Sequence, residues 1–99
     1  MRTMLTIEMP VEKGNTAIAD GTFPKVMQAT LERLKPEAAY FTAVKGNRCA
    51  IIVFDLAHPS DIPSICEPLF NELNAAVELK PVMTADDVAA GLAKAHAAR

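Results

Sequence analysis

The pattern that most constrains the fold is a pair of adjacent strands, residues 38–44 and 49–56, joined by a tight turn. Gly46-Asn47 at the tip favours a type II′ turn, because glycine accepts the positive φ that the first central position requires. Side chains along a strand point alternately to opposite sides. The composition of each side of the hairpin therefore predicts what must cover it.

The two faces of this hairpin differ in composition. The predicted turn places Thr42 opposite Ile51 and Tyr40 opposite Val53, and partners across an antiparallel pair share a face. One face is wholly apolar and holds Ala39, Phe41, Ala43, Ala50, Ile52, Phe54 and Leu56. The other face mixes polar and apolar side chains and holds Tyr40, Thr42, Val44, Cys49, Ile51, Val53 and Asp55.

A helix pattern and a strand pattern lie on each side of the hairpin. Residues 3–9 alternate as a half-buried strand, and residues 75–83 form a fourth strand. An apolar stripe at helical spacing runs between Thr22 and Pro36 and predicts the first main helix. The segment 11–21 is predicted as a loop, with one helical turn at 15–20 as the alternative, because its glycines and the following proline argue against one long helix.

A second main helix follows the hairpin. Ser60 and Ser64 are the alternative caps of this helix. Ser64 and Glu67 have capping-box spacing, so we favour the later start for the regular helix, with Pro68 in its opening turn. Thr84 and Asp87 form a second capping box and predict a C-terminal helix at about residues 84–98.

This order of elements, β-α-β-β-α-β-α, predicts an α+β fold in one domain, residues 1–99. Two split βαβ units give the ferredoxin-like plait, a four-stranded antiparallel sheet with both main helices on one face. Seven side chains should meet those helices: Leu5, Ile7, Phe41, Ile52, Phe54, Val77 and Leu79.

Composition excludes several classes of function. The net charge of −2 gives no electrostatic reason to expect nucleic acid or an anionic membrane as partner. No run of about 18 apolar residues is present to span a bilayer. Cys49 and Cys66 fit no metal spacing and are expected to be buried thiols in a cytoplasmic protein. The fold is shared with RNA-recognition modules, but Tyr40 is the one aromatic residue predicted on the mixed face, so we reject RNA.

The opposite side of the sheet, here called the open face, is predicted to lack a helix above it. It carries Met4, Thr6, Glu8, Tyr40, Thr42, Ile51, Val53, Asp55, Glu78 and Lys80. This set is too apolar to be left in water and too polar for a dry core. We expect a second copy to stack its own sheet there, giving a homodimer with two-fold symmetry and polar clefts near the ends of the seam. The C-terminal helix would cover part of the seam or clasp the partner.

The cleft supplies candidate site residues. For a small organic ligand, the binding residues are Thr6, Thr42, Ile51, Val53, Asp55, Glu78 and Lys80. His58, Tyr40 and Glu8 are the candidates for acid/base catalysis, because a carboxylate in an apolar seam or a histidine after a strand can move a proton. The structural alternatives are an exposed loop histidine and the polar rim of a dimer interface. No metal or cofactor is expected.

Several short motifs resemble a known group of proteins. They are "PVEKGN", "PEAAYF", "HPSDIP", "EPLF" and "PVMTADD". The chain is similar over most of its length to small bacterial proteins of unknown function with the dimeric α/β-barrel fold. The resemblance implies this fold and a homodimer, and it transfers no catalytic residue. More distantly, the same barrel hosts cofactor-independent monooxygenases, muconolactone-isomerase-like enzymes, haem-degrading enzymes and amino-acid-sensing regulators, which is an analogy of fold alone.

Two hypotheses of function follow. The first is a cytoplasmic homodimer that binds a small organic ligand at the sheet face or has a structural or regulatory role. The second is a cofactor-independent monooxygenase or isomerase that uses the acid/base residues of the cleft. An amino-acid sensor is a third class, but it would need a fused effector domain.

Overall fold

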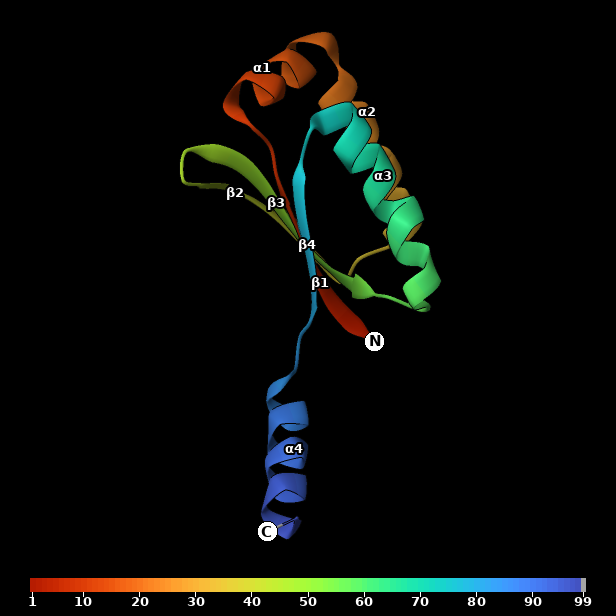
Figure 1. The fold of residues 1–99 in the computed structure, drawn as a ribbon, viewed down its shortest axis with the longest axis vertical. Helices are drawn as coiled ribbons and strands as arrows, with labels where there is room; N and C mark the ends of the chain where they lie inside the picture. Colours follow the sequence, from red (N-terminus) through yellow and green to blue (C-terminus); the bar gives the residue numbers. More distant parts are fainter. Residues whose placement is uncertain (99) are drawn as a thin grey trace.

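The computed structural model describes residues 1–98. Four strands form one antiparallel sheet in the order β2-β3-β1-β4 (Figure 1). The strands are β1 (Arg2–Glu8), β2 (Ala38–Val44), β3 (Asn47–Asp55) and β4 (Ala76–Pro81). The helices are α1 (Val11–Asp20), α2 (Thr22–Leu34), α3 (Ile62–Leu73) and α4 (Ala85–Ala97), with a 3₁₀ turn η1 at Pro59–Asp61. This order and these connections confirm the predicted ferredoxin-like plait.

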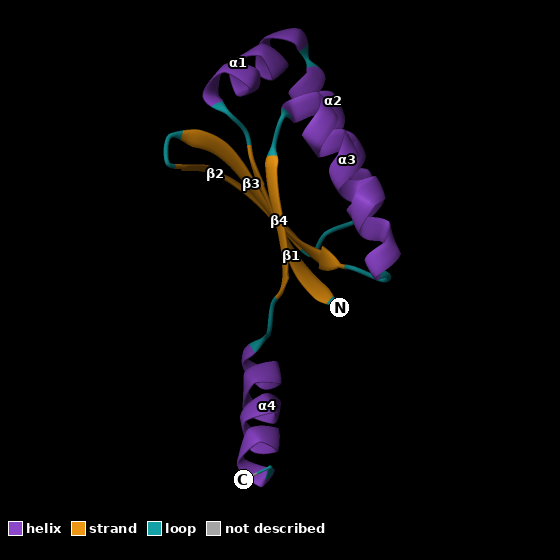
Figure 2. Ribbon diagram, in the orientation of Figure 1, coloured by secondary structure: helices purple, strands orange, loops and turns teal. Residues whose placement is uncertain are grey.

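The core lies between the sheet and the helices on one of its sides, and Figure 2 shows α1, α2 and α3 together on that side. Leu5 and Ile7 of β1 are fully buried, while Met4, Thr6 and Glu8 are half-buried, which confirms the predicted alternation. The side chains of Ile52, Leu69 and Leu73 complete the centre of the core and are also fully buried. Within the described residues, no helix lies over the opposite side of the sheet, as predicted.

The segment predicted as a loop forms the helix α1, Val11–Asp20, which is longer than the one turn of the alternative prediction. Its two glycines do not interrupt the helix, and each has another role. Gly21 adopts φ 83° and ends α1 in the left-handed conformation that glycine accepts readily. A Cβ at Gly14 would come within 2.9 Å of Nη1 of Arg48, so this glycine marks a close approach between α1 and β3. Nη1 of Arg48 also donates to Oδ1 of Asn15, which holds the same contact.

The hairpin has a different turn from the one predicted. Val44 pairs with Asn47, so the central residues are Lys45 and Gly46, with φ values of 53° and 81°. Two positive φ values define a type I′ turn rather than type II′. The observed register of β2 and β3 differs from the predicted register by two residues, so Tyr40 lies opposite Ile51 rather than Val53. An even shift leaves every side chain on its predicted face.

This turn predicts a stabilising substitution. Lys45→Asn should raise the free energy of unfolding by about 0.5–1 kcal/mol, because asparagine tolerates the left-handed conformation better than lysine and Asn-Gly is the preferred type I′ pair. Urea denaturation measures the change. Lys45→Thr is the matched control and should lower stability, since a β-branched residue is strained at positive φ. Equal stability of the two variants would contradict the turn assignment.

The helix α3 begins at Ile62, two residues before the predicted start, and the predicted Ser64–Glu67 capping box is wrong. Oγ of Ser64 instead donates to the carbonyl oxygen of Asp61 at 2.9 Å. Pro68 consequently lies inside the helix rather than in its opening turn. A proline there removes one helical hydrogen bond.

The predicted burial of Phe41 is also wrong. Its side chain points to the helix side of β2 but is 56% exposed, because β2 is an edge strand that the helices cover incompletely. Phe23 of α2 lies beside it, with ring centroids 6.4 Å apart. The edge of the helix layer therefore carries exposed apolar surface that the hairpin pattern did not predict.

The helix α4 has the predicted capping box. The amide of Asp87 donates to Oγ1 of Thr84 at 3.1 Å, and the amide of Thr84 donates to Oδ2 of Asp87 at 3.0 Å. Every side chain between Ala85 and Ala97 is exposed. Figure 1 shows that α4 projects away from the sheet, beyond the end of β4. Within residues 1–98, every helix is too short or too polar to cross a bilayer.

Candidate functional site

The open face is organised in rows that cross the strands. One row runs from Tyr40 through Ile51 and Thr6 to Glu78. The next row toward the start of β1 contains Ala38, Val53, Met4 and Lys80. Met4, Ile51 and Val53 are half-buried and lie on the two central strands. They form an apolar centre.

The two edges of the open face are polar. On the β2 edge, Tyr40 is 67% exposed and Thr42 is exposed beside it. On the β4 edge, Glu78 and Lys80 are exposed, with Oε2 and Nζ 4.0 Å apart. An exposed pair at this distance contributes little to stability. Its side chains therefore remain available for other contacts.

At the hairpin end of the open face, Glu8 is half-buried and lies opposite Cys49. Nδ2 of Asn47 donates to Oε2 of Glu8 at 3.3 Å. Cys49 is buried between Glu8 and Thr42, its neighbours across the sheet. Burial raises the pKa of this thiol, and the charge of Glu8 raises it further. The thiol is therefore a weak nucleophile at neutral pH.

At the other end of the open face, the charged groups are paired with one another. The amino group of Met1 donates to Oδ1 of Asp55 at 2.5 Å, and this hydrogen bond lowers the pKa of the carboxyl group. Nε of Arg2 donates to Oε1 of Glu37 at 2.5 Å. Asp55, a predicted ligand residue, thus lies at one end of the open face and has a partner within the chain.

The three candidate acid/base residues do not converge within one chain. Tyr40 and Glu8 share the open face and lie in neighbouring rows. His58 follows β3 at the end where Arg2 pairs with Asp55, and it is exposed just before η1. Glu8 lies six positions along β1 from Arg2, which is about 20 Å along a strand. His58 is therefore at the far end of the sheet from Glu8.

The structure adds Arg2, Glu37 and Asn47 to the polar groups of the open face. Arg2 follows the same alternation as Met4, so the strand pattern of β1 contained the signal for it. Asn47 was assigned to the turn, and the corrected register places it in β3 beside Glu8. Nothing in the sequence marked Glu37, because it precedes β2 and pairs with a residue far away in the chain.

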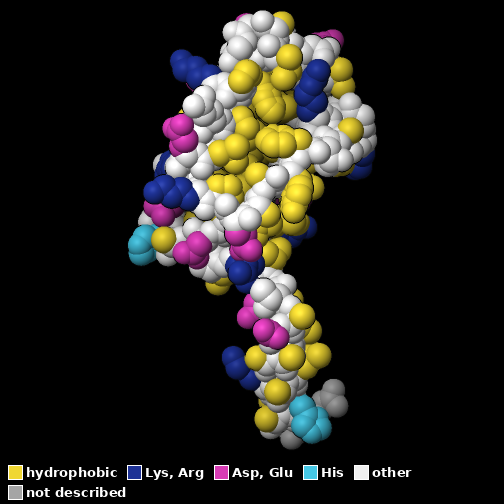
Figure 3. Space-filling model, turned by 180° about the vertical axis from the view of Figure 1, so that it is seen from behind, with side chains coloured by type: hydrophobic (Ala, Val, Ile, Leu, Met, Phe, Trp, Pro, Cys, Tyr) yellow, Lys and Arg dark blue, Asp and Glu magenta, His cyan; other side chains and the backbone are white. Residues whose placement is uncertain are grey.

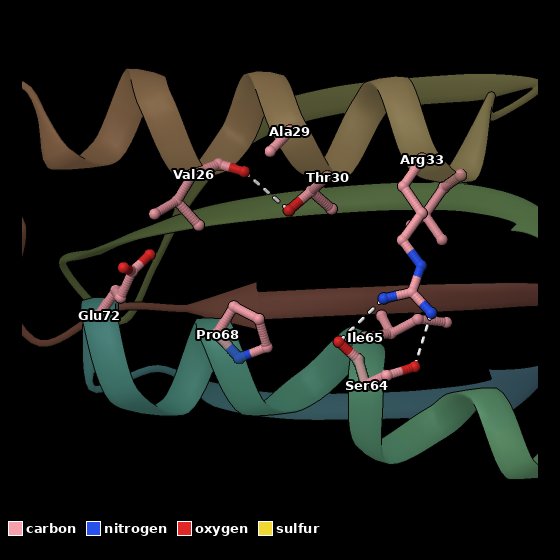
Figure 4. Close-up of a pocket in the computed structure, with 9 residues that line it drawn as sticks. Val26, Ala29, Thr30, Arg33, Ser64, Ile65, Pro68 and Glu72 are labelled. Atoms are coloured by element: carbon pink, nitrogen blue, oxygen red, sulfur yellow. Dashed lines mark hydrogen bonds between the residues drawn. The ribbon is translucent and has the colours of Figure 1, made fainter.

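A cavity of about 170 Å³ lies between α2 and α3 on the outer side of the helix layer (Figure 4). Its polar end has a structural explanation. Pro68 has no N–H group to donate to the carbonyl oxygen of Ser64, its partner four residues earlier in the helix. Nη1 of Arg33 donates to that oxygen at 3.0 Å, and Nη2 donates to Oγ of Ser64 at 2.6 Å. Arg33 thus replaces the bond that Pro68 removes.

A larger apolar depression, the α2–β2 groove, has a volume of about 480 Å³. Figure 3 shows hydrophobic side chains gathered in a hollow between the helix layer and the hairpin, and others along α4. The groove is lined by Ile18, Phe23, Pro24, Met27, Gln28, Leu31, Glu32 and Phe41. Among residues 1–98, no group of His, Cys, Asp and Glu side chains is arranged to hold a metal ion.

Comparisons with known proteins identify no family. No protein-family model matches the chain, and no curated protein matches it. A solved structure described as "De novo designed protein Ferredog-Diesel" is similar, with a TM-score of 0.49 and 9% sequence identity. The match covers 82% of this chain and 85% of that chain. The fold assignment therefore rests on the strand order and connections given above.

Proposed function

We propose that the protein is a homodimer whose two open faces stack and enclose a cleft for a small organic ligand. The composition of the open face carries this proposal. Its centre is Met4, Ile51 and Val53, and its edges carry Tyr40 and the Glu78–Lys80 pair. An apolar centre with a polar rim is the usual anatomy of a protein interface. Two-fold symmetry is the commonest way for one surface patch to cover itself.

The side chains of the open face define the class of ligand. An apolar ligand body would lie against Ile51, while the hydroxyl groups of Thr6 and Tyr40 would fix its orientation. Glu8 adds a carboxylate acceptor beyond the oxygen that Asn47 engages. A small aromatic or aliphatic molecule with a hydroxyl or amine group suits this set. Two buried free thiols suit a reducing compartment, so we place the protein in the cytoplasm.

Acid/base catalysis in the same cleft is the second candidate function. The half-buried carboxylate of Glu8 favours it, because this group shares the open face with the Tyr40 hydroxyl. Such a pair would serve a cofactor-independent monooxygenase or isomerase acting on a phenolic or carbonyl compound. His58 would take part only if a second copy brought it to the cleft.

Native mass spectrometry of the protein purified from its own host tests the ligand. We expect a dimer with twice the 10.6 kDa mass of the chain and a small organic adduct. Thr6→Val keeps the shape of the side chain and removes its hydroxyl group, so ligand affinity should fall about tenfold while the dimer persists. Asn71→Glu, on the outer side of α3, is the control and should retain the adduct. A dimer without any adduct, in every preparation from the host, would contradict ligand binding.

A further inference from the structure

Within residues 1–98, no other element buries a side chain of the helix α4. Met83, Val88 and Leu92 are 71%, 41% and 65% exposed, and Val88 and Leu92 are four residues apart on one side of the helix. A helix of 13 residues is marginal alone in water, and Gly91 weakens it by about 1 kcal/mol relative to alanine. We therefore expect the apolar side of α4 to pack against another surface.

The α2–β2 groove offers the complementary surface. Ile18 and Phe41 are 48% and 56% exposed on its walls. An amphipathic helix that lays residues spaced by four into an apolar groove is a recurring mode of recognition. The charges also match, because Glu32 lines the groove while Lys94 lies in the last turn of α4.

The two surfaces lie apart within one chain. β4 ends at Pro81, opposite Thr3, whereas Phe41 lies in the row of Ile7 on the other edge of the sheet. The corner from which α4 leaves is thus about 13 Å from the groove along the strands and about 14 Å across them. Figure 1 shows that α4 points away from the sheet at that corner. A second copy can bring the helix and the groove together while α4 keeps this direction.

The area of the open face also favours a second copy of the chain as the partner of α4. Four strands of this length give a flat footprint of about 400 Å². A stable interface buries about 800 Å² on each partner. The flat footprint of the open face is smaller than this area, and an added helix from each copy supplies further surface.

Resting on the proposed homodimer, we propose that α4 is exchanged between two copies, so that each α4 lies in the α2–β2 groove of the other chain. One diagonal of the sheet joins the corner where α4 leaves β4 to the corner with the α2–β2 groove. A two-fold axis along the other diagonal places the α4 corner of each chain over the groove corner of its partner. The strands of the two sheets then cross at close to a right angle, one of the two arrangements that stacked sheets adopt. The last turn of α4 lies beside the partner's Glu32.

Cross-linking between two differently labelled chains tests the exchange. One chain carries Leu92→Cys on the apolar side of α4, and the other carries Gln28→Cys on the exposed rim of the groove. A short bis-maleimide should join them. The native thiols of Cys49 and Cys66 are buried with raised pKa values, so they react slowly. Ala90→Cys, on the opposite side of α4, is the matched control and should cross-link at least tenfold less.

Sedimentation of the same variants separates the possible failures. The protein can sediment as a dimer while the Leu92→Cys chain forms no cross-link to the Gln28→Cys chain, or cross-links only to another Leu92→Cys chain. Either result overturns the exchange of α4 and leaves the stacked sheets in place. A chain that sediments as a monomer overturns the homodimer and the exchange together. Cross-linking of the Leu92→Cys and Gln28→Cys pair in a dimer supports both.

Discussion

Ile51→Glu is expected to convert the protein into a folded monomer. Ile51 lies at the centre of the open face, between Tyr40 and Thr6 in the same row. A carboxylate there would be buried without a partner in the stacked dimer, and the two-fold axis would place two such charges close together. The dissociation constant should rise at least 100-fold, which corresponds to about 2.7 kcal/mol. Sedimentation velocity at several concentrations measures it, and circular dichroism checks the fold.

Two further variants make this test specific. Thr6→Lys introduces a charge on the neighbouring strand of the same row, and it should also dissociate the dimer. Asn71→Glu adds the same charge as Ile51→Glu at an exposed position of α3, and it should leave the dimer intact. If both open-face variants dimerise as tightly as the unmodified protein, the interface lies elsewhere.

Arg33→Ala is expected to lower the free energy of unfolding by about 1–2 kcal/mol, although its side chain is exposed. The loss arises because the guanidinium donates to the Ser64 carbonyl that Pro68 leaves without a helical donor. In a Pro68→Ala background, the amide of residue 68 can supply that bond. The same substitution of Arg33 should then cost less than about 0.5 kcal/mol, a coupling typical of residues in one network. Urea denaturation of the unmodified protein, the two single variants and the double variant gives the double-mutant cycle.

The controls for this cycle use the same two helices. Lys25→Ala removes an exposed cation from α2 and should change stability by less than about 0.5 kcal/mol. Pro68→Ala alone should stabilise the protein, since proline inside a helix costs up to about 3 kcal/mol relative to alanine. Equal losses from Arg33→Ala with and without Pro68 would show that the arginine acts through another contact.

The fold could be predicted from the sequence because its strongest patterns are local. The alternation of β1, the capping box of Thr84 and Asp87, and the two faces of the hairpin each depend on residues close in the chain. The turn predicted at Gly46-Asn47 is wrong, yet the residues of the open face were assigned correctly, because a shift of two residues preserves the side of every side chain.

The remaining features depend on contacts between distant residues. Gly14 looks like a helix breaker until Arg48 is seen packed against it. Pro68 can lie inside α3 because a side chain of α2 replaces its missing donor. The exposure of Phe41 follows from the width of the helix layer, which periodicity does not encode. The pairing of Asp55 with the amino group of Met1 likewise joins residues far apart in sequence.

The central claim is that the open face is covered by a second copy of the chain. Sedimentation equilibrium of the unmodified protein at micromolar concentration tests it most directly. We predict a mass twice the 10.6 kDa of the chain. A single-chain mass up to the highest soluble concentration, with Met4, Ile51 and Val53 in contact with water, would contradict it.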